Sequence, residues 1–138
     1  MTPLLLLFVV VIVETSRCPH QCRCYNTQVN CISGKLTHIP HGIPKDTTIL
    51  EINSNKLLTT IHRKDFLGLE KLKILLLTNN MLTFIGPKIF TSLTELKVLD
   101  LNGNNISKLH REAFFGLNKL LSSQLYANKL SSAGEKIF

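Results

Sequence analysis

The chain repeats itself along its length. Residues 69–92, 93–116 and 117–138 can be superposed without gaps, because Leu69, Leu93 and Leu117 stand 24 positions apart. An earlier copy ends at Phe66. A fixed period of about 20 to 50 residues is the signature of a solenoid, in which each copy buries its apolar side against its neighbours. We therefore expect a stack of similar turns, with function on a surface rather than in a pocket.

Each copy follows the frame L-x-x-L-x-L-x-x-N-x-L, the pattern of a leucine-rich repeat. Side chains alternate along a strand, so Leu75 and Leu77 should point inward, and Ile74 and Leu76 outward. One short strand per copy predicts an α/β-type solenoid, with a curved parallel sheet on the concave side and a mostly irregular convex side. Two successive copies fill the frame with Leu72, Leu75, Leu77, Asn80 and Leu82, and with Leu96, Leu99, Leu101, Asn104 and Ile106.

Two other columns recur with the leucines. Asparagine side chains carry both donors and an acceptor, so stacked asparagines can satisfy loop backbone groups that would otherwise be buried without partners. We expect an asparagine ladder and a phenylalanine column through the stack. The ladder comprises Asn55, Asn80, Asn104 and Asn128, and the column comprises Phe66, Phe90, Phe114 and Phe138.

Residues 1–17 are interpreted as a signal peptide. The apolar run at residues 4–13 is too short to cross a bilayer, and a polar stretch follows it. No Lys or Arg precedes the run, and an uncleaved anchor is the alternative. No later stretch is long enough to span a membrane, so we expect a secreted, extracellular protein.

All four cysteines lie within a short segment after the predicted signal peptide. In an exported chain an even number of cysteines predicts disulfides, and three pairings are open. Zinc is the competing interpretation, but the single residue between Cys22 and Cys24 is poor chelate spacing. The cluster consists of Cys18, Cys22, Cys24 and Cys31.

After the signal peptide we expect one domain with two parts. Residues 18–44 should form a cysteine-rich cap that covers the first leucine layer, and residues 45–138 should form about four repeats. Ser123 takes the place of core Leu99, and the sequence shows no second cysteine cluster. We therefore expect the last repeat to be irregular and uncapped.

Lys and Arg exceed Asp and Glu by 7. In a secreted protein this excess favours acidic glycans or acidic protein surfaces as partners over nucleic acid, for which aromatic residues are too few. A solvated basic surface without a partner is the alternative.

The cap CPHQCRCYNTQVNCISGKLTHIPHGIPKDT, joined to repeats of the form F-x-G-L-x-x-L-K-x-L-x-L-x-x-N, resembles extracellular leucine-rich repeat proteins with a cysteine-rich N-terminal flank. The chain resembles Slit axon-guidance ligands and the variable lymphocyte receptors of jawless vertebrates, and small leucine-rich proteoglycans share both pieces. The resemblance implies disulfides Cys18–Cys24 and Cys22–Cys31. It also implies protein recognition on the concave sheet, by a Roundabout-like receptor in Slit-like proteins, with heparan sulfate assisting.

Candidate binding residues follow from the outward positions of the repeat frame. An apolar strip beside acidic points suits a protein partner, although outward β-branched residues also favour strands. The concave candidates are Ile49, Glu51, Asn53, Lys73, Ile74, Leu76, Thr78, Lys97, Val98, Asp100, Asn102, Gln124 and Tyr126.

A basic column on the opposite side offers a second candidate site, for a sulfated glycan. A solvated convex face is the alternative interpretation. The column contains Arg63, Lys64, Lys88 and Arg111. Asn105 begins the sequon Asn-Ile-Ser and is a candidate glycosylation site expected to point outward.

No enzyme signature, metal-ligand spacing or cofactor motif is present in the sequence. Two functions remain. The first is a secreted, Slit-like module that binds a receptor or adhesion protein through its concave face. The alternative is a matrix or glycosaminoglycan-binding structural protein of the small leucine-rich proteoglycan type.

Overall fold

The computed structural model describes residues 18–32 and 34–131. The predicted signal peptide and Phe138 of the phenylalanine column lie outside the described residues. Within the described ranges, no helix is both long and apolar enough to cross a membrane.

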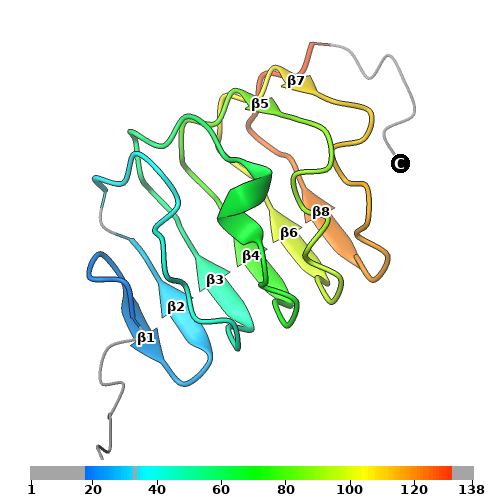
Figure 1. The fold of residues 1–138 in the computed structure, drawn as a ribbon. Helices are drawn as coiled ribbons and strands as arrows, with labels where there is room; N and C mark the ends of the chain where they lie inside the picture. The colour runs from blue at the N-terminus through cyan, green and yellow to red at the C-terminus, as the bar shows by residue number, and fades with distance from the viewer. Residues whose placement is uncertain (1–17, 33, 132–138) are drawn as a thin grey trace, which may run out of the picture.

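The described chain winds into a solenoid whose main sheet has six strands in the order β1-β2-β3-β4-β6-β8 (Figure 1). All neighbouring pairs from β2 to β8 are parallel, whereas β1 pairs antiparallel with β2. The predicted parallel sheet is thus confirmed, and β1 is an addition that the repeat pattern did not predict. The strands are β1 (Arg23–Tyr25), β2 (Gln28–Asn30), β3 (Ile49–Glu51), β4 (Ile74–Leu76), β6 (Val98–Asp100) and β8 (Ser122–Gln124).

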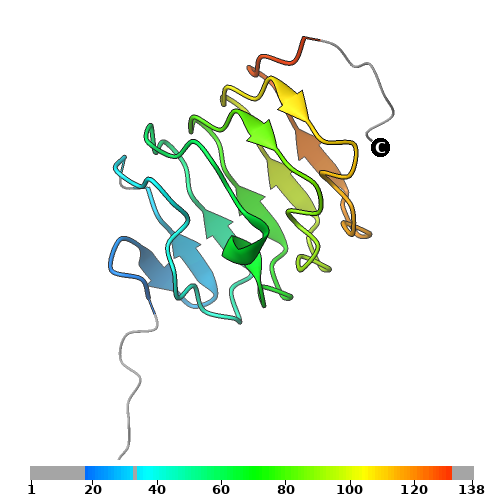
Figure 2. The same cartoon turned by 45° about the horizontal axis from the view of Figure 1, so that its top comes forward.

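The other side of each turn is mostly irregular, as predicted. Its regular elements are the 3-10 helix η2 (Arg63–Phe66) and a small parallel sheet of β5 (Phe84–Ile85) and β7 (Lys108–Leu109). In the tilted view of Figure 2 these elements lie across the turn from the main sheet. The main sheet therefore presents an uncovered outer face, which we call the concave face.

The register of the sheet stacks the leucines of the frame. Leu50 pairs with Leu75, and Leu75 pairs with Leu99, and all three side chains are fully buried. The residues before and after each of these leucines are only half-buried, as strand alternation requires. Each turn therefore adds one leucine layer to a continuous core.

A column of phenylalanines lines the far side of the core. The ring centroids of Phe66 and Phe90 lie 5.5 Å apart, and those of Phe90 and Phe114 lie 6.4 Å apart in a stacked arrangement. Both distances fall in the range of favourable aromatic pairs, so this column joins consecutive turns.

The asparagine ladder forms as the sequence predicts. Asn80 Nδ2 donates to the backbone carbonyls of Ile52, at 2.6 Å, and Leu77, at 2.9 Å, and its Oδ1 accepts from the N–H of Asn55. Asn104 repeats both donations one turn later, to Leu77 and its own turn. These side chains satisfy the backbone where the chain leaves the sheet.

The N-terminal cap covers the first leucine layer through β2, where Val29 pairs with Leu50. Two disulfides hold it, Cys18–Cys24 and Cys22–Cys31, the pairing that the resemblance implies. Cys31 is fully buried, so the second bridge is part of the core.

The last described turn is less well packed than those before it. Ser123 pairs with Leu99 in the sheet register, so a serine occupies a core leucine position. Its surroundings are also thinner: Leu130 is 40% exposed, whereas Ile106, one turn earlier in the frame, is fully buried. This turn therefore buries less apolar side chain at these two positions than the turn before it.

Candidate functional site

The concave face is built from outward positions of consecutive strands. Because the strands are in register, equivalent residues form rows across the sheet, about 4.8 Å apart. The first row is Ile49, Ile74, Val98 and Ser122, and the second is Glu51, Leu76, Asp100 and Gln124. These rows contain the sequence-predicted residues of the strands, and all are half-buried.

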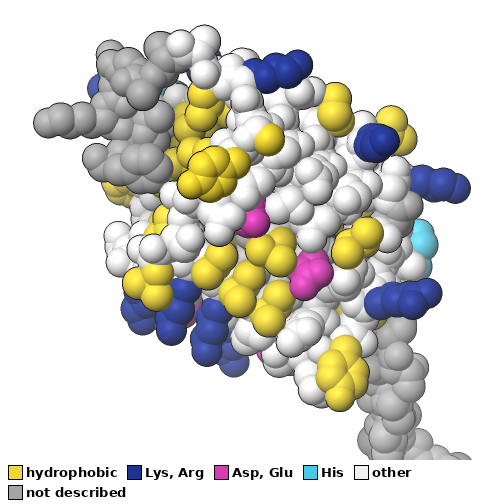
Figure 3. Space-filling view, turned by 180° about the vertical axis from the view of Figure 1, so that it is seen from behind, with side chains coloured by type: hydrophobic (Ala, Val, Ile, Leu, Met, Phe, Trp, Pro, Cys, Tyr) yellow, Lys and Arg dark blue, Asp and Glu magenta, His cyan; other side chains and the backbone are white. Residues whose placement is uncertain are grey.

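Four of these side chains make one apolar patch. Ile49, Ile74 and Val98 are consecutive in the first row, and Leu76 lies in the second row on the middle strand. We call this group the apolar patch. Figure 3 shows hydrophobic side chains gathered on this face between acidic side chains.

The acidic flanks are Glu51 and Asp100, the neighbours of Leu76 in the second row. Glu51 Oε2 accepts a 3.3 Å hydrogen bond from Asn30 Nδ2, and Asp100 Oδ1 accepts one of 2.9 Å from the N–H of Asn102. The carboxylates thus lie on either side of Leu76 along the sheet, and both are held by neighbouring groups.

A polar row follows the strands at their carboxyl ends. Asn53 Oδ1 accepts hydrogen bonds from the N–H and hydroxyl of Thr78, at 2.9 and 2.8 Å. One turn later Asn102 Nδ2 donates to Gln124 Oε1, and Asn102 Oδ1 accepts from the N–H of Tyr126. The Tyr126 side chain is 77% exposed. This row is therefore hydrogen-bonded within itself and leaves one aromatic ring for a partner.

The remaining predicted concave residues, Lys73 and Lys97, are exposed and come directly before strands β4 and β6. The N–H of Lys97 donates to the carbonyl of Lys73 at 2.8 Å, so the two are neighbours. They lie at the border of the face, not among its rows.

The four basic residues of the opposite side are all exposed. Lys88 Nζ lies 3.9 Å from a carboxylate oxygen of Glu112 and 5.2 Å from the ring centre of Phe115. The Glu112 carboxylate therefore partly neutralises the charge of Lys88. Arg63 and Lys64 lie in η2. Arg111 lies in the turn after β7.

Asn105, the candidate glycosylation residue, is half-buried, and its Nδ2 lies 3.6 Å from the sulfur of Met81. Its side chain therefore rests along the neighbouring turn rather than projecting freely. It lies after the sheet residues of its turn, away from the apolar patch.

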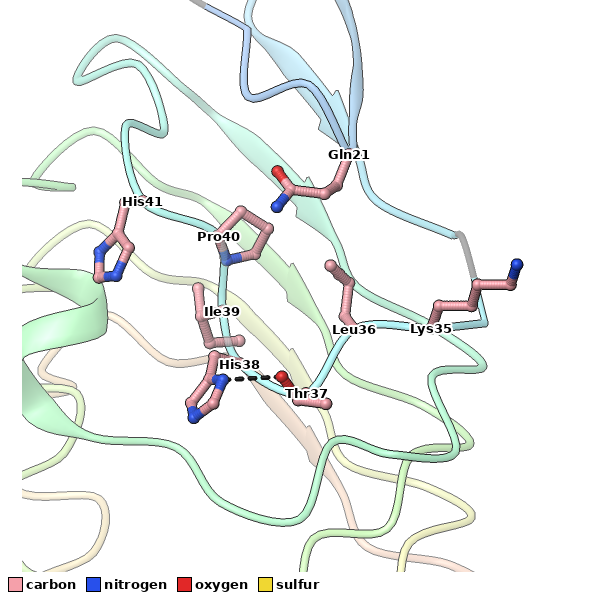
Figure 4. A pocket seen from close by; sticks show the side chains of 8 residues that line it. All are labelled: Gln21, Lys35, Leu36, Thr37, His38, Ile39, Pro40 and His41. Atoms are coloured by element: carbon pink, nitrogen blue, oxygen red, sulfur yellow. Dashed lines mark hydrogen bonds between the residues drawn. The ribbon is translucent and has the colours of Figure 1, made fainter.

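The cap contains an open hollow of about 310 Å³ (Figure 4). His38 Nδ1 and the hydroxyl of Thr37 are 2.8 Å apart on its wall, and Pro40 and Leu36 line it. Among the described residues, no group of three or more His, Cys, Asp or Glu side chains is arranged to hold a metal. The hollow therefore lacks a set of metal ligands among the described residues. No motif in the sequence predicted the hollow.

Two family models match the chain. The leucine rich repeat model matches residues 70–130, and the leucine rich repeat N-terminal domain model matches residues 17–44. The chain is an extracellular-type leucine-rich repeat protein with a disulfide-bonded N-terminal cap. Neither matching model is a catalytic family.

Curated relatives of this leucine-rich repeat protein include biglycan of Xenopus laevis, 43% identical over 44% of the chain, and decorin of Gallus gallus, 38% identical over 44% of it. Immunoglobulin superfamily member 10 of Rattus norvegicus is 41% identical over 49% of the chain. The matched part spans 16% of biglycan and of decorin and 3% of the immunoglobulin superfamily member.

Among solved structures, human 5T4, also named trophoblast glycoprotein, is similar with a TM-score of 0.72 and 28% identity. That match covers 80% of this chain and 42% of 5T4. TLR13 in its complex with ssRNA13 is similar with a TM-score of 0.61 and 29% identity, over 66% of this chain and 13% of TLR13.

Proposed function

We propose that this leucine-rich repeat protein is a secreted binding module that recognises a partner protein through its concave face. The observation that carries the proposal is the apolar patch. Strand propensity accounts for outward Ile49, Ile74 and Val98, since β-branched residues favour strands, but it does not account for Leu76 at the centre. Contiguous apolar surface with a polar rim is typical of the core of a protein interface.

The charges beside the patch favour a protein over a sulfated glycan as its occupant. Glu51 and Asp100 lie on either side of Leu76, so a sulfated chain crossing the sheet would meet two carboxylates. A protein segment can place an apolar side chain between them and hydrogen-bond donors against them. The finer proposal, a Slit-like ligand for a Roundabout-like receptor, is supported by the resemblance of the cap and repeats.

Binding of the labelled, disulfide-intact protein to cultured cells tests this proposal. Leu76→Arg places a charge in the patch and should abolish binding. The double variant Arg63→Glu with Lys64→Glu reverses two charges on η2, away from the patch, and should bind as the unaltered protein does. Loss of binding in the η2 variant with full binding by Leu76→Arg would contradict the proposal.

The relatives favour a second candidate function. Biglycan and decorin are leucine-rich repeat proteoglycans, and Arg63 and Lys64 are exposed on η2. A matrix or heparan sulfate-binding role would use this basic side. It requires that the η2 charge reversal lower the salt concentration at which the protein elutes from a heparin column, while Leu76→Arg leaves elution unchanged.

A further inference from the structure

A strip of lysines borders the concave face at the amino ends of its strands. The turn before each strand is closed by the same backbone hydrogen bond, from Leu72 to Leu69, from Leu96 to Leu93 and from Leu120 to Leu117. Residues at equal places in these turns are therefore neighbours along the sheet. The strip consists of Lys71, Lys73, Lys97 and Lys119, and we call it the lysine strip.

One carboxylate lies inside the lysine strip. Glu95 accepts a 2.7 Å hydrogen bond from Lys119 Nζ, and this contact, with further attraction from Lys97 and Lys73, lowers the pKa of Glu95. Glu70 is the other acidic residue of these turns. Four lysines against two carboxylates leave the border positively charged, and Lys and Arg side chains gather beside the hydrophobic group in Figure 3.

We infer that the lysine strip and the apolar patch form one surface that binds an extended, acidic protein segment. This inference rests on the proposed function and names the chemistry of its partner. Lys73 and Lys97 directly precede Ile74 and Val98 in the chain, so the positive border and the apolar patch are continuous.

The short distance between the lysine strip and the apolar patch limits which sequences the bound segment can have. An extended chain advances about 3.3 Å per residue, so an Asp or Glu within two positions of a bulky apolar residue can reach the lysines while that residue lies on the patch. The charges also determine where the acidic side chain of the bound segment lies. Glu51 and Asp100 repel it from the second row, and the lysines attract it to the border. A sulfated glycan could contact the strip but would leave the patch uncovered.

Selection from a random 12-residue peptide library displayed on phage tests this inference. The targets are the disulfide-intact protein, the double variant Lys73→Glu with Lys97→Glu, and the matched double variant Arg63→Glu with Lys64→Glu, each checked for an unchanged thermal transition. The unaltered protein and the η2 variant should select peptides with an Asp or Glu within two positions of a bulky apolar residue. The strip variant should select basic peptides, and should bind one acidic peptide at least about tenfold more weakly.

Identical peptides selected by the unaltered protein and the strip variant would overturn the inference. So would loss of heparin retention in the strip variant together with no acidic peptide selected, since the strip would then be a glycan site. Leu76→Arg distinguishes failure of the acidic-partner inference from failure of concave-face binding itself. Peptides sensitive to Leu76→Arg but not to the strip variant would refute the acidic partner alone, and peptides sensitive to neither would refute concave-face binding.

Discussion

Replacing Asn80 by alanine should be among the most destabilising single changes in this protein. The Asn80 side chain is 2% exposed and makes three hydrogen bonds to the backbone, to the carbonyls of Ile52 and Leu77 and from the N–H of Asn55. The Leu77 carbonyl keeps a second hydrogen bond from Asn104, so Asn80→Ala removes the side-chain partner of two buried backbone groups, the Ile52 carbonyl and the Asn55 N–H. At about 1 to 3 kcal/mol for each group, we expect Asn80→Ala to lower the free energy of unfolding by roughly 2 to 6 kcal/mol.

Asn128→Ala is the matched control. Asn128 makes the same kinds of bonds, donating to Leu101 and Leu125 and accepting from Ile106, but it is only half-buried. Water can replace those bonds, so the loss should be about 1 kcal/mol or less. Asn80→Asp should be nearly as damaging as Asn80→Ala at neutral pH, because it keeps the acceptor and loses both donated bonds.

Urea unfolding of the disulfide-intact variants, followed by circular dichroism, measures these differences. The slopes of the transitions should agree if only the native state is affected. Equal losses at Asn80 and Asn128, or a loss below about 1 kcal/mol at Asn80, would show that burial does not determine how much the ladder hydrogen bonds stabilise the fold.

Three further outcomes are expected. Ser123→Leu should raise the free energy of unfolding by about 1 kcal/mol or more in urea titrations, because the site stacks on Leu99; no gain would mean that this layer is not packed. Removing the Cys22–Cys31 bridge by two serine substitutions should lower stability by about 2 to 3 kcal/mol, and by more than removing Cys18–Cys24, because Cys31 is buried. Calorimetric transitions lowered equally by both removals would contradict this. Lys119→Met should raise the pKa of Glu95 toward its ordinary value, as followed by carboxyl NMR. Because that pKa is lowered in the folded state, the contact stabilises the fold above the unfolded-state pKa of Glu95, and its contribution is lost as pH falls through the folded-state pKa. An unchanged titration would exclude Lys119 as the cause.

Much of the fold could be predicted because the repeat pattern indicates which residues occupy the same position in successive turns. The strand positions, the burial of Leu75 and Leu99, the asparagine ladder and the pairing of Ser123 with Leu99 all follow from an offset of 24 residues, which is 25 between the first two repeats. Equivalence along a period fixes register, which is the step that usually defeats sequence reasoning for sheets.

The elements that were not predicted lack that signal. Strand β1 has three exposed residues and turns into β2 through Asn26 at a φ of 53°, so it shows no apolar alternation. Strands β5 and β7 are two residues long, too short for any period. Their pairing follows from the stacking of the turns.

The lysine strip could have been found in part. Applying the 24-residue offset to Lys71 reaches Glu95 and then Lys119, and applying it to Lys73 reaches Lys97. The sequence does not show that these two sets of residues lie side by side next to the apolar patch. Lys73 and Lys97 precede the strands, where the alternation of inward and outward side chains does not apply. The hydrogen bond between Lys119 and Glu95 could be seen only in the structure.

A glycan attached to the concave face would block any partner that binds there. Leu76→Asn creates the acceptor tripeptide Asn-Leu-Thr with Leu77 and Thr78 on the apolar patch. Leu57→Asn creates the same tripeptide with Leu58 and Thr59, and Leu57 is exposed on a turn outside the sheet.

Both variants are to be produced in secreting cells, with glycan occupancy confirmed by mass, and their binding to the cell surface compared with that of unglycosylated Leu76→Gln. We expect the glycan at position 76 to abolish binding and the glycan at position 57 to leave binding intact. Undiminished binding by fully glycosylated Leu76→Asn would contradict recognition through the concave face.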